Sequence, residues 1–266
     1  MQFIRNLLVL ALPIVAVSCT PKPWEVNIKT NLTNSSETIS TQDLEILNWL
    51  STYRDSVNKT MSKVIAKTDV DLLTLRSRGK ITLEQETQAN LGRVAADYVQ
   101  QAADNYMISQ FGSLSHFTIL NHFGLRNSIS QGDITLGKVF EVMPFDNELV
   151  ILQLTGSQCD SLFNFISTLG GCPVASLELK LNDSTYTDAI IRGLKFDSRK
   201  SYFVATSDFL LGGGDNFIML KHPKKIHKTG ILIRDILIEG FEREFSQSGR
   251  INPKKEPRVK QTSTIK

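Results

Sequence analysis

The stretch YFVATSDFLLGGGDNF, residues 202–217, joins an apolar run to three consecutive glycines. The β-branched and aromatic residues of 202–206 predict a strand, with Phe209 at its end and Asp215 closing the glycine run. A glycine run is expected where the backbone turns sharply or is approached closely, because a Cβ would stand in the way. The stretch therefore predicts a strand followed by an open turn, with a ring on one side and a carboxylate on the other.

Regular spacing of apolar residues on both sides of this stretch predicts further helices and strands. A helical period runs over 41–68, where the shared face holds Leu44, Leu47, Leu50, Tyr53, Val57, Met61 and Val64. Further helices are predicted over 90–107, 157–171 and 230–245, and further strands over 117–121, 148–154, 177–181 and 189–194. Because the two kinds of element mix without a regular βαβ rhythm, we expect an α/β (α+β) fold, a single domain over 41–246 with mixed β-sheets flanked by helices.

The amino terminus carries Arg5 and then an apolar run over 7–17. This run is too short to cross a bilayer core of about 30 Å as a helix, so residues 1–18 are predicted to be a signal peptide. The small residues before Cys19 resemble a bacterial lipobox, which implies lipidation of Cys19; an ordinary signal peptide with an incidental cysteine is the alternative. Either interpretation places the protein outside the cytoplasm, and the lipobox would anchor it to a membrane.

The two ends of the mature chain have the composition of solvated segments. Residues 19–40 are rich in Thr, Ser and Asn and are expected to form a tether. Residues 247–266 are expected to form a flexible basic tail. Outside that tail the Lys and Arg residues are not concentrated, and with a net charge of +3 this argues against nucleic-acid binding.

The two remaining cysteines, Cys159 and Cys172, lie thirteen residues apart without a CxxC spacing. They are a poor zinc signal. In an oxidising compartment they could form a disulfide, and two buried free thiols are an equally good interpretation.

Hydrolytic machinery is missing from the sequence. The chain has four histidines, and it lacks the DxH, GDxxD and GHxH patterns of a dinuclear metal centre. It has no G-x-S-x-G nucleophile elbow, and no GK[ST] follows the glycine run as in a P-loop. We therefore expect no catalytic residue, metal ligand or cofactor in this chain, and a binding surface in place of a reaction centre.

Three segments in order resemble the C-terminal domain of the 5′-nucleotidase family. They are ANLGRVAADYV (89–99), LNHFGLRNSISQGDITLGKVFEVMPFDNELVILQLTG (120–156) and YFVATSDFLLGGGDNF (202–217). The resemblance covers about residues 41–246 and implies a four-layer fold. In that family this domain follows a dimetal phosphatase domain and binds the nucleoside part of the substrate. No phosphatase domain is found in this sequence.

The resemblance also implies roles for particular residues. Two aromatic faces would sandwich the base, Gly213 and Gly214 would let the main chain approach the sugar, and Asp215 would accept hydrogen bonds from the ribose hydroxyls. Asn121 would read a base edge, and Arg126 would face the sugar or phosphate. The two aromatic residues are Phe145 and Phe209. Without the resemblance, these residues would be interpreted as core, turn, cap and surface residues.

Two departures from the family pattern bear on the ligand. Thr87 stands where the family often has a second substrate arginine, and His122 stands where it has a small or polar residue. Loss of the arginine would weaken phosphate binding. Two functions stay open: the recognition half of a split nucleotidase that acts with a separate metallophosphatase in nucleotide catabolism, and a stand-alone nucleoside-binding or structural lipoprotein without a hydrolytic partner.

Overall fold

The computed structural model describes residues 41–75, 80–182, 184–254 and 257–261. The signal peptide expected over 1–18 and the lipidated tether expected over 19–40, with Cys19, lie outside the described residues. The chain divides into two compact units, Met1–Asn48 and Trp49–Lys266. Of the first unit only the beginning of one helix is described, and the fold is that of the second unit.

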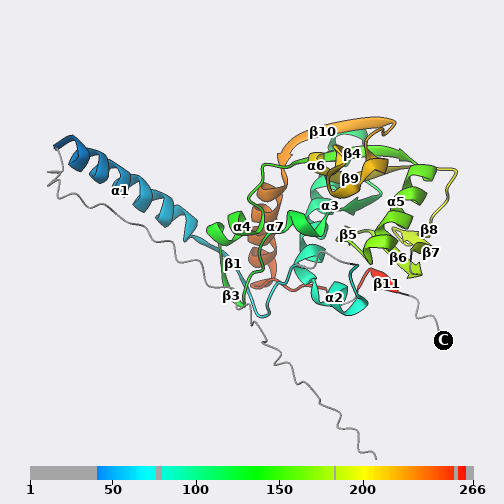
Figure 1. Ribbon diagram of the computed structural model, residues 1–266, viewed down its shortest axis with the longest axis horizontal. Coiled ribbons are helices and arrows are strands. Elements are labelled where there is room, and N and C mark those ends of the chain that lie inside the picture. Colours follow the sequence, from blue (N-terminus) through cyan, green and yellow to red (C-terminus); the bar gives the residue numbers. More distant parts are fainter. Residues whose placement is uncertain (1–40, 76–79, 183, 255–256, 262–266) are drawn as a thin grey trace, which may run out of the picture. The chain divides into compact units, whose positions relative to one another are not determined.

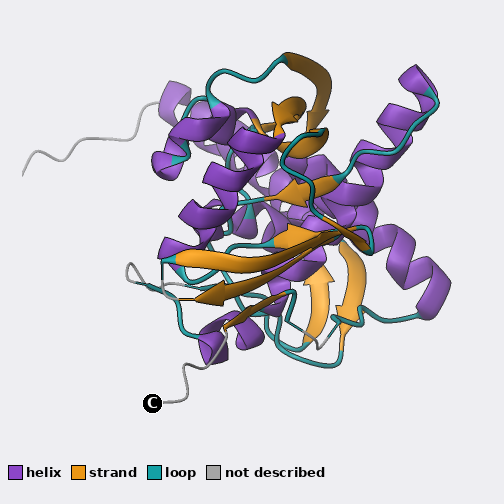
Figure 2. Ribbon diagram, turned by 90° about the vertical axis from the view of Figure 1, so that its right-hand side faces the viewer, coloured by secondary structure: helices purple, strands orange, loops and turns teal. Residues whose placement is uncertain are grey.

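A five-stranded sheet forms the centre of the second unit (Figures 1 and 2). Its strand order is β10-β4-β9-β2-β5, and β2 and β9 are parallel whereas every other neighbouring pair is antiparallel. The bounds are β2 Phe117–Ile119, β4 Glu148–Thr155, β5 Val174–Ala175, β9 Ser201–Ser207 and β10 Lys225–Leu232. The strands predicted over 117–121, 148–154 and 202–206 are confirmed.

Alternating side chains of β4 enter two different cores, because successive residues of a strand point to opposite faces. Leu149 and Ile151 pack in the core beneath α3 (Asn90–Phe111) and α7 (Ile233–Ser248). Val150 and Leu152 pack in the second core, with α5 (Gly156–Leu169). The two long helices α3 and α7 lie side by side, with Gly240 of α7 against the Tyr98 ring (Figure 1).

A second sheet completes the layers on the far side of α5, which contacts strands of both sheets. Its order is β11-β6-β7-β8, and the bounds are β6 Leu177–Asn182, β7 Thr185–Ile191, β8 Leu194–Lys195 and β11 Val259–Gln261. The strand predicted over 177–181 is thus present. The single strand predicted over 189–194 is wrong, because β7 ends at Ile191, Arg192 and Gly193 turn the chain with positive φ values, and β8 begins at Leu194. Helices, sheet, helix and sheet alternate as four layers, as the resemblance implies.

Residues 258–261 differ from the solvated tail expected over 247–266. β11 pairs in parallel with β6, and Val259 is 1% exposed. Arg258 donates to the Val174 carbonyl oxygen and to the Asp97 carboxylate. Backbone pairing and one buried side chain therefore attach this polar segment to the domain.

The first predicted helix is shorter than its apolar period suggests. α1 covers Thr41–Met61, and the end of the pattern, Val64–Thr68, forms strand β1, which pairs antiparallel with β3 (Gly132–Thr135). Trp49 and Tyr53 stack with ring centroids 5.9 Å apart, yet both are exposed, as are Leu50 and Val57. The apolar face of α1 is therefore not part of the described core.

Cys159 and Cys172 are both buried free thiols, so the second of the two interpretations holds. Burial raises the pKa of the Cys159 thiol to about 12 and that of Cys172 well above its usual value. Both are therefore protonated thiols at neutral pH. Among the described helices, none has the length and apolar character needed to span a bilayer.

Candidate functional site

Three loops meet at one edge of the five-stranded sheet. Since β2 and β9 are parallel neighbours, the segments that follow them emerge at the same edge. β4 is antiparallel to β9, so the segment that precedes β4 arrives at that edge as well. The topology therefore brings together Asn121 after β2, Phe209 after β9, and Phe145 before β4, although they come from three separate parts of the chain.

Phe209 lies on a four-residue helix, α6 (Asp208–Leu211), and not at the end of the strand as the sequence suggested. The Ser207 hydroxyl caps this helix by accepting from the Leu210 N–H at 3.2 Å, and Leu210 is fully buried. The Asp208 carboxylate accepts from the backbone N–H groups of Phe209 and Glu148. These contacts fix a short helix on which residue Phe209 is 43% exposed.

The glycine run turns the chain after α6, and each glycine of the predicted pair has its own physical reason. Gly213 has φ +84°, a conformation that favours glycine. A Cβ on Gly214 would lie 2.4 Å from ring atoms of Phe209, so the bare Cα makes room for that ring. Asp215 and Asn216 then adopt positive φ values of 50° and 64°. Asp and Asn adopt this left-handed conformation more readily than other non-glycine residues, so the turn continues through them.

Asp215, in the 3-10 turn η2 (Gly214–Asn216), is held by Asn121. The Asn121 Nδ2 donates to Asp215 Oδ2 at 2.5 Å. The resemblance implied that Asn121 hydrogen-bonds an edge of the base. In the structure its side-chain amide instead orients the Asp215 carboxylate. One oxygen of Asp215 is thus engaged and the other is available to a ligand.

A cavity of about 280 Å³ opens among the three loops. It is lined by Asn121, Phe123, Gly124, Arg126, Phe145, Asn147, Phe209 and Asp215. The structure thus brings together five of the seven predicted residues, while Gly213 and Gly214 shape the turn without lining the cavity. Phe123, Gly124 and Asn147 were not assigned to the site from the sequence, although all three stand in the segment that carried the resemblance.

Arg126 supplies the positive charge of the cavity. Its backbone N–H donates to the Val142 carbonyl oxygen at 2.7 Å, which ties the η1 segment (His122–Gly124 and its flank) to the end of α4 (Leu136–Val142). Its guanidinium carbon lies 5.7 Å from the centroid of the Phe145 ring. No carboxylate of the described residues pairs with it within salt-bridge distance. The guanidinium can therefore meet an anionic group of a ligand.

His122 does not line the cavity. It is 7% exposed, and its Nε2 lies 3.4 Å from Oε2 of Glu86, a residue of α2 (Leu83–Gln88) that is 3% exposed. The two atoms are within ion-pair distance but without hydrogen-bond geometry. The ring of His122 is directed toward α2, so the departure from the family pattern at this position does not fill the cavity. The side chain of Thr87 lies outside the described part of the structure.

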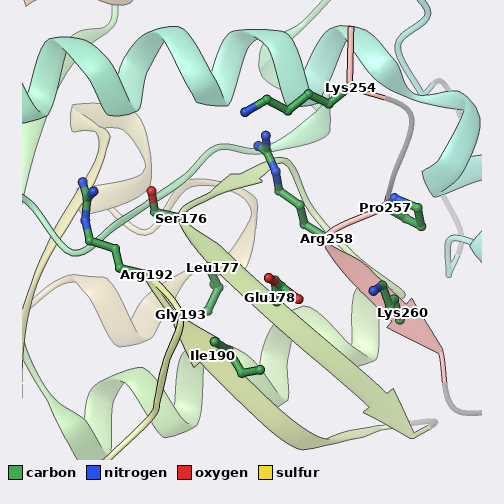
Figure 3. A pocket seen from close by; sticks show the side chains of 10 residues that line it. All are labelled: Ser176, Leu177, Glu178, Ile190, Arg192, Gly193, Lys254, Pro257, Arg258 and Lys260. Carbon is green, nitrogen blue, oxygen red and sulfur yellow. The ribbon is translucent and has the colours of Figure 1, made fainter.

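A larger cleft of about 570 Å³ lies at the second sheet, lined by Ser176, Leu177, Glu178, Ile190, Arg192, Gly193, Lys254, Pro257, Arg258 and Lys260 (Figure 3). Three of its cations are already engaged: Arg192 pairs with Asp104 at 2.5 Å, and Arg258 and Lys254 both pair with Asp97, at 2.6 Å and 3.7 Å. This cleft has charge pairs and no aromatic ring in its lining, so it lacks the features of the smaller cavity that suit a base.

No group of three metal-ligating side chains comes together within residues 41–75, 80–182, 184–254 and 257–261. The cavity residues themselves are two amides, three aromatic rings, one guanidinium, one glycine and one carboxylate. Such a set can stack on a planar ring, accept hydrogen bonds from hydroxyls and attract an anion. It offers binding chemistry.

Known proteins match both the sequence and the fold. The chain is 26% identical to Protein UshA of Escherichia coli K12 over 178 residues, which cover 62% of this chain and 32% of UshA. It is 28% identical to Silent protein UshA(0) of Salmonella typhimurium over 159 residues, covering 57% of this chain and 27% of that protein. The chain therefore spans about a third or less of the length of these relatives.

The solved 5′-nucleotidase precursor from Thermus thermophilus superimposes with a TM-score of 0.65 and 24% identity, over 83% of this chain and 44% of that one. The Haemophilus influenzae NAD nucleotidase superimposes with a TM-score of 0.63 and 15% identity, over 83% of this chain and 41% of that one. These likenesses confirm the fold. The family model described as "5′-nucleotidase, C-terminal domain" matches residues 64–222, which is more than half of the chain. The chain therefore belongs to the family of 5′-nucleotidase C-terminal domains.

Proposed function

We propose that this chain is the nucleoside- and nucleotide-recognition domain of a 5′-nucleotidase-type hydrolase, with the metal centre supplied by a separately encoded metallophosphatase. One observation carries the proposal: Phe145 and Phe209, 42% and 43% exposed, line one cavity with an Asp215 carboxylate that Asn121 orients. With Phe123, which is also 42% exposed, they gather three exposed rings around one cavity, and such a contiguous apolar patch commonly marks a ligand-binding site. Stacking on such rings is worth about 1–3 kcal/mol per base in proteins that bind single strands.

The size and charge of the cavity fit one nucleoside. Its volume of about 280 Å³ is near the lower end of small-molecule sites. The rings suit a base, the free oxygen of Asp215 suits ribose hydroxyls, and Arg126 at the rim suits a phosphate. A phosphate held at the rim would be presented outward, where a partner enzyme could reach it. The names of the relatives, 5′-nucleotidase among them, are consistent with this assignment.

Isothermal titration of the purified mature domain with adenosine, uridine and their 5′-monophosphates tests the proposal directly. We expect saturable binding of nucleosides and no phosphate release by the domain alone. Co-titration with a candidate metallophosphatase from the same organism tests the split-enzyme part. If the domain binds no nucleoside at millimolar concentration, the proposal is wrong, and a structural lipoprotein becomes the better account.

Replacing Asp215 with asparagine is expected to weaken riboside binding about tenfold, about 1.4 kcal/mol, because the ribose hydroxyls lose a charged acceptor. Asparagine is the cleanest substitution, since it tolerates the positive φ of this position. Titration with adenosine, 2′-deoxyadenosine and adenine measures the effect. The free base should bind both proteins equally. An equal loss for adenine and adenosine would show that Asp215 does not contact the sugar.

We further propose that Cys19 bears a lipid anchor on the extracytoplasmic side of a bacterial membrane. The proposal rests on the apolar run over 7–17 and the small residues before Cys19. Cys19→Ser is expected to move the protein from the membrane fraction to the soluble fraction of lysed cells. Unchanged fractionation of the variant would contradict it.

A further inference from the structure

One wall of the cavity stands on a loop that has little apolar anchorage of its own. The loop 143–147 joins α4 to β4, and it presents Phe145 with 42% of the residue exposed. Only Met143, at 3% exposed, is buried among the loop's hydrophobic residues. The ring of Phe145 can form a defined wall only if something outside the loop fixes its backbone.

Arg234, the second residue of α7, contacts this loop at three places. Its Nη1 lies 3.5 Å from the Met143 carbonyl oxygen and 3.4 Å from the Phe145 carbonyl oxygen. Its Nη2 donates to the Asp146 carboxylate at 2.5 Å. The neighbouring backbone adds a fourth tether, since the Ile233 N–H donates to the Asn147 carbonyl oxygen at 2.9 Å. The beginning of α7 therefore holds nearly the whole loop.

The environment of the guanidinium requires an arginine. The side chain is 11% exposed, and its Cζ lies 4.3 Å from the centroid of the Phe140 ring. A planar fork can rest on a ring while it donates along its edge to two carbonyls and a carboxylate, and an ammonium group cannot do both. The three donors of a lysine lie on one nitrogen, so they cannot be spread along an edge over these three acceptors as those of the guanidinium are.

This arrangement contributes little to global stability. The Asp146 side chain is 74% exposed, and exposed ion pairs are worth little. The Arg234 Nε is buried with no hydrogen-bond partner among the described residues, which is a cost. A buried guanidinium that is only partly satisfied, and whose hydrogen bonds among the described residues all go to one ligand-facing loop, is explained by the geometry it imposes on that loop.

We infer that Arg234 is a positioning residue for ligand binding: it fixes the loop that carries Phe145 and so sets the aromatic wall of the cavity. The inference rests on the proposed function for its consequence, since Arg234 itself does not line the cavity. It acts through Phe145. Removing Arg234 should therefore matter only while the Phe145 ring is present.

A double-mutant cycle measures this dependence by titration with adenosine. Arg234→Met keeps an apolar stem against Phe140 and is expected to weaken binding about three- to tenfold. On the Phe145→Ala background the same substitution should cause no further loss. Arg234→Lys should fail to restore affinity. The control is Arg243→Met, which removes another arginine of α7 that lies over a ring, 5.8 Å from the Tyr98 centroid and away from the cavity lining. Additive losses in the cycle would overturn the inference.

Hydrogen–deuterium exchange of the ligand-free protein gives a second readout that does not depend on nucleoside binding. Arg234→Met should raise exchange in the peptide that covers 143–147 and leave β9 unchanged, whereas Arg243→Met should change neither. Unchanged exchange over 143–147 would overturn the inference whether or not the protein binds a nucleoside. If the wild-type protein binds no nucleoside but exchange over 143–147 responds as expected, the proposed function is wrong. The conclusion that Arg234 holds the loop 143–147 is then still supported.

Discussion

Replacing Gly170 with alanine is expected to destabilise the protein by about 3–5 kcal/mol. Gly170 caps α5 with φ +81°, a conformation that costs alanine about 1–2 kcal/mol. A Cβ there would also lie 2.1 Å from the Ile81 carbonyl oxygen and 2.8 Å from its nitrogen. Backbone cannot yield as a flexible side chain does, so the Ile81 segment must move away from α5.

That movement would break further contacts. The Ile81 N–H donates to the Leu169 carbonyl oxygen at 2.8 Å, and the Ile81 carbonyl accepts from Gln261 at the end of β11. Ile81 itself packs with Leu75 and Ala89 in a small buried cluster. One methyl group would therefore loosen α5, the segment before α2, and β11 together. For a chain of this size the loss corresponds to about 6–20 °C in Tm.

Gly249→Ala is the matched control. Gly249 caps α7 with φ +71° and ψ −4°, nearly the same conformation as Gly170, but a Cβ there meets nothing within 4 Å. We expect a loss of about 1 kcal/mol, from backbone conformation alone. Thermal unfolding followed by circular dichroism measures both variants. Equal decreases in Tm would show that the close approach of Ile81 has no energetic effect.

The sequence predicted the elements whose burial follows a strong period. β4 is nearly continuous in apolar residues because both of its faces are buried, and α7 places Ile233, Ile236, Leu237 and Phe241 in the core, as its spacing predicts. These patterns arise from burial itself. They could be found without knowing which layer each element joins.

The elements that the sequence did not predict depend on tertiary pairing. β10 has mostly exposed side chains, and it is a strand because it pairs with β4 over most of its length. β11 is three residues within a basic segment, and its partner β6 is far away in the chain. The last three residues of β10 were predicted to begin the helix over 230–245, and β11 was predicted to lie in the flexible tail, so tertiary pairing overrides the local pattern in both cases.

The residues of the candidate site likewise divide into those that the sequence predicted and those that only the folded structure shows. The resemblance predicted Asn121, Arg126, Phe145, Phe209 and Asp215, which line the cavity. Arg234 could not be found from the sequence, because it lies on an amphipathic helix far from every motif. Its importance comes from carbonyl oxygens that only the folded chain brings within its reach. The hydrogen bond that ties Asn121 to Asp215 likewise spans 94 positions, and no spacing predicts it.

The Phe209 ring is the part of the cavity whose removal should reduce binding most. Phe209→Ala is expected to weaken adenosine binding about ten- to hundredfold, about 1–3 kcal/mol, because the base loses a stacking face. Adenosine titration measures the loss. Stability should change little, since the ring is 43% exposed while Leu210 anchors α6. Phe209→Leu keeps an apolar side chain but removes the aromatic ring. The variant therefore separates the contribution of stacking on the base from that of apolar contact alone.

Phe111→Ala is the matched control for Phe209→Ala. Phe111 is 52% exposed at the end of α3 and is not part of the cavity lining, so its removal should leave adenosine affinity unchanged. The free base adenine should lose as much affinity as adenosine in Phe209→Ala, the opposite of the pattern expected for Asp215→Asn, because the ring contacts the base and the carboxylate contacts the sugar. A large fall in Tm together with unchanged affinity would instead make Phe209 a core residue, and the aromatic wall would then have to be assigned to Phe145 and Phe123.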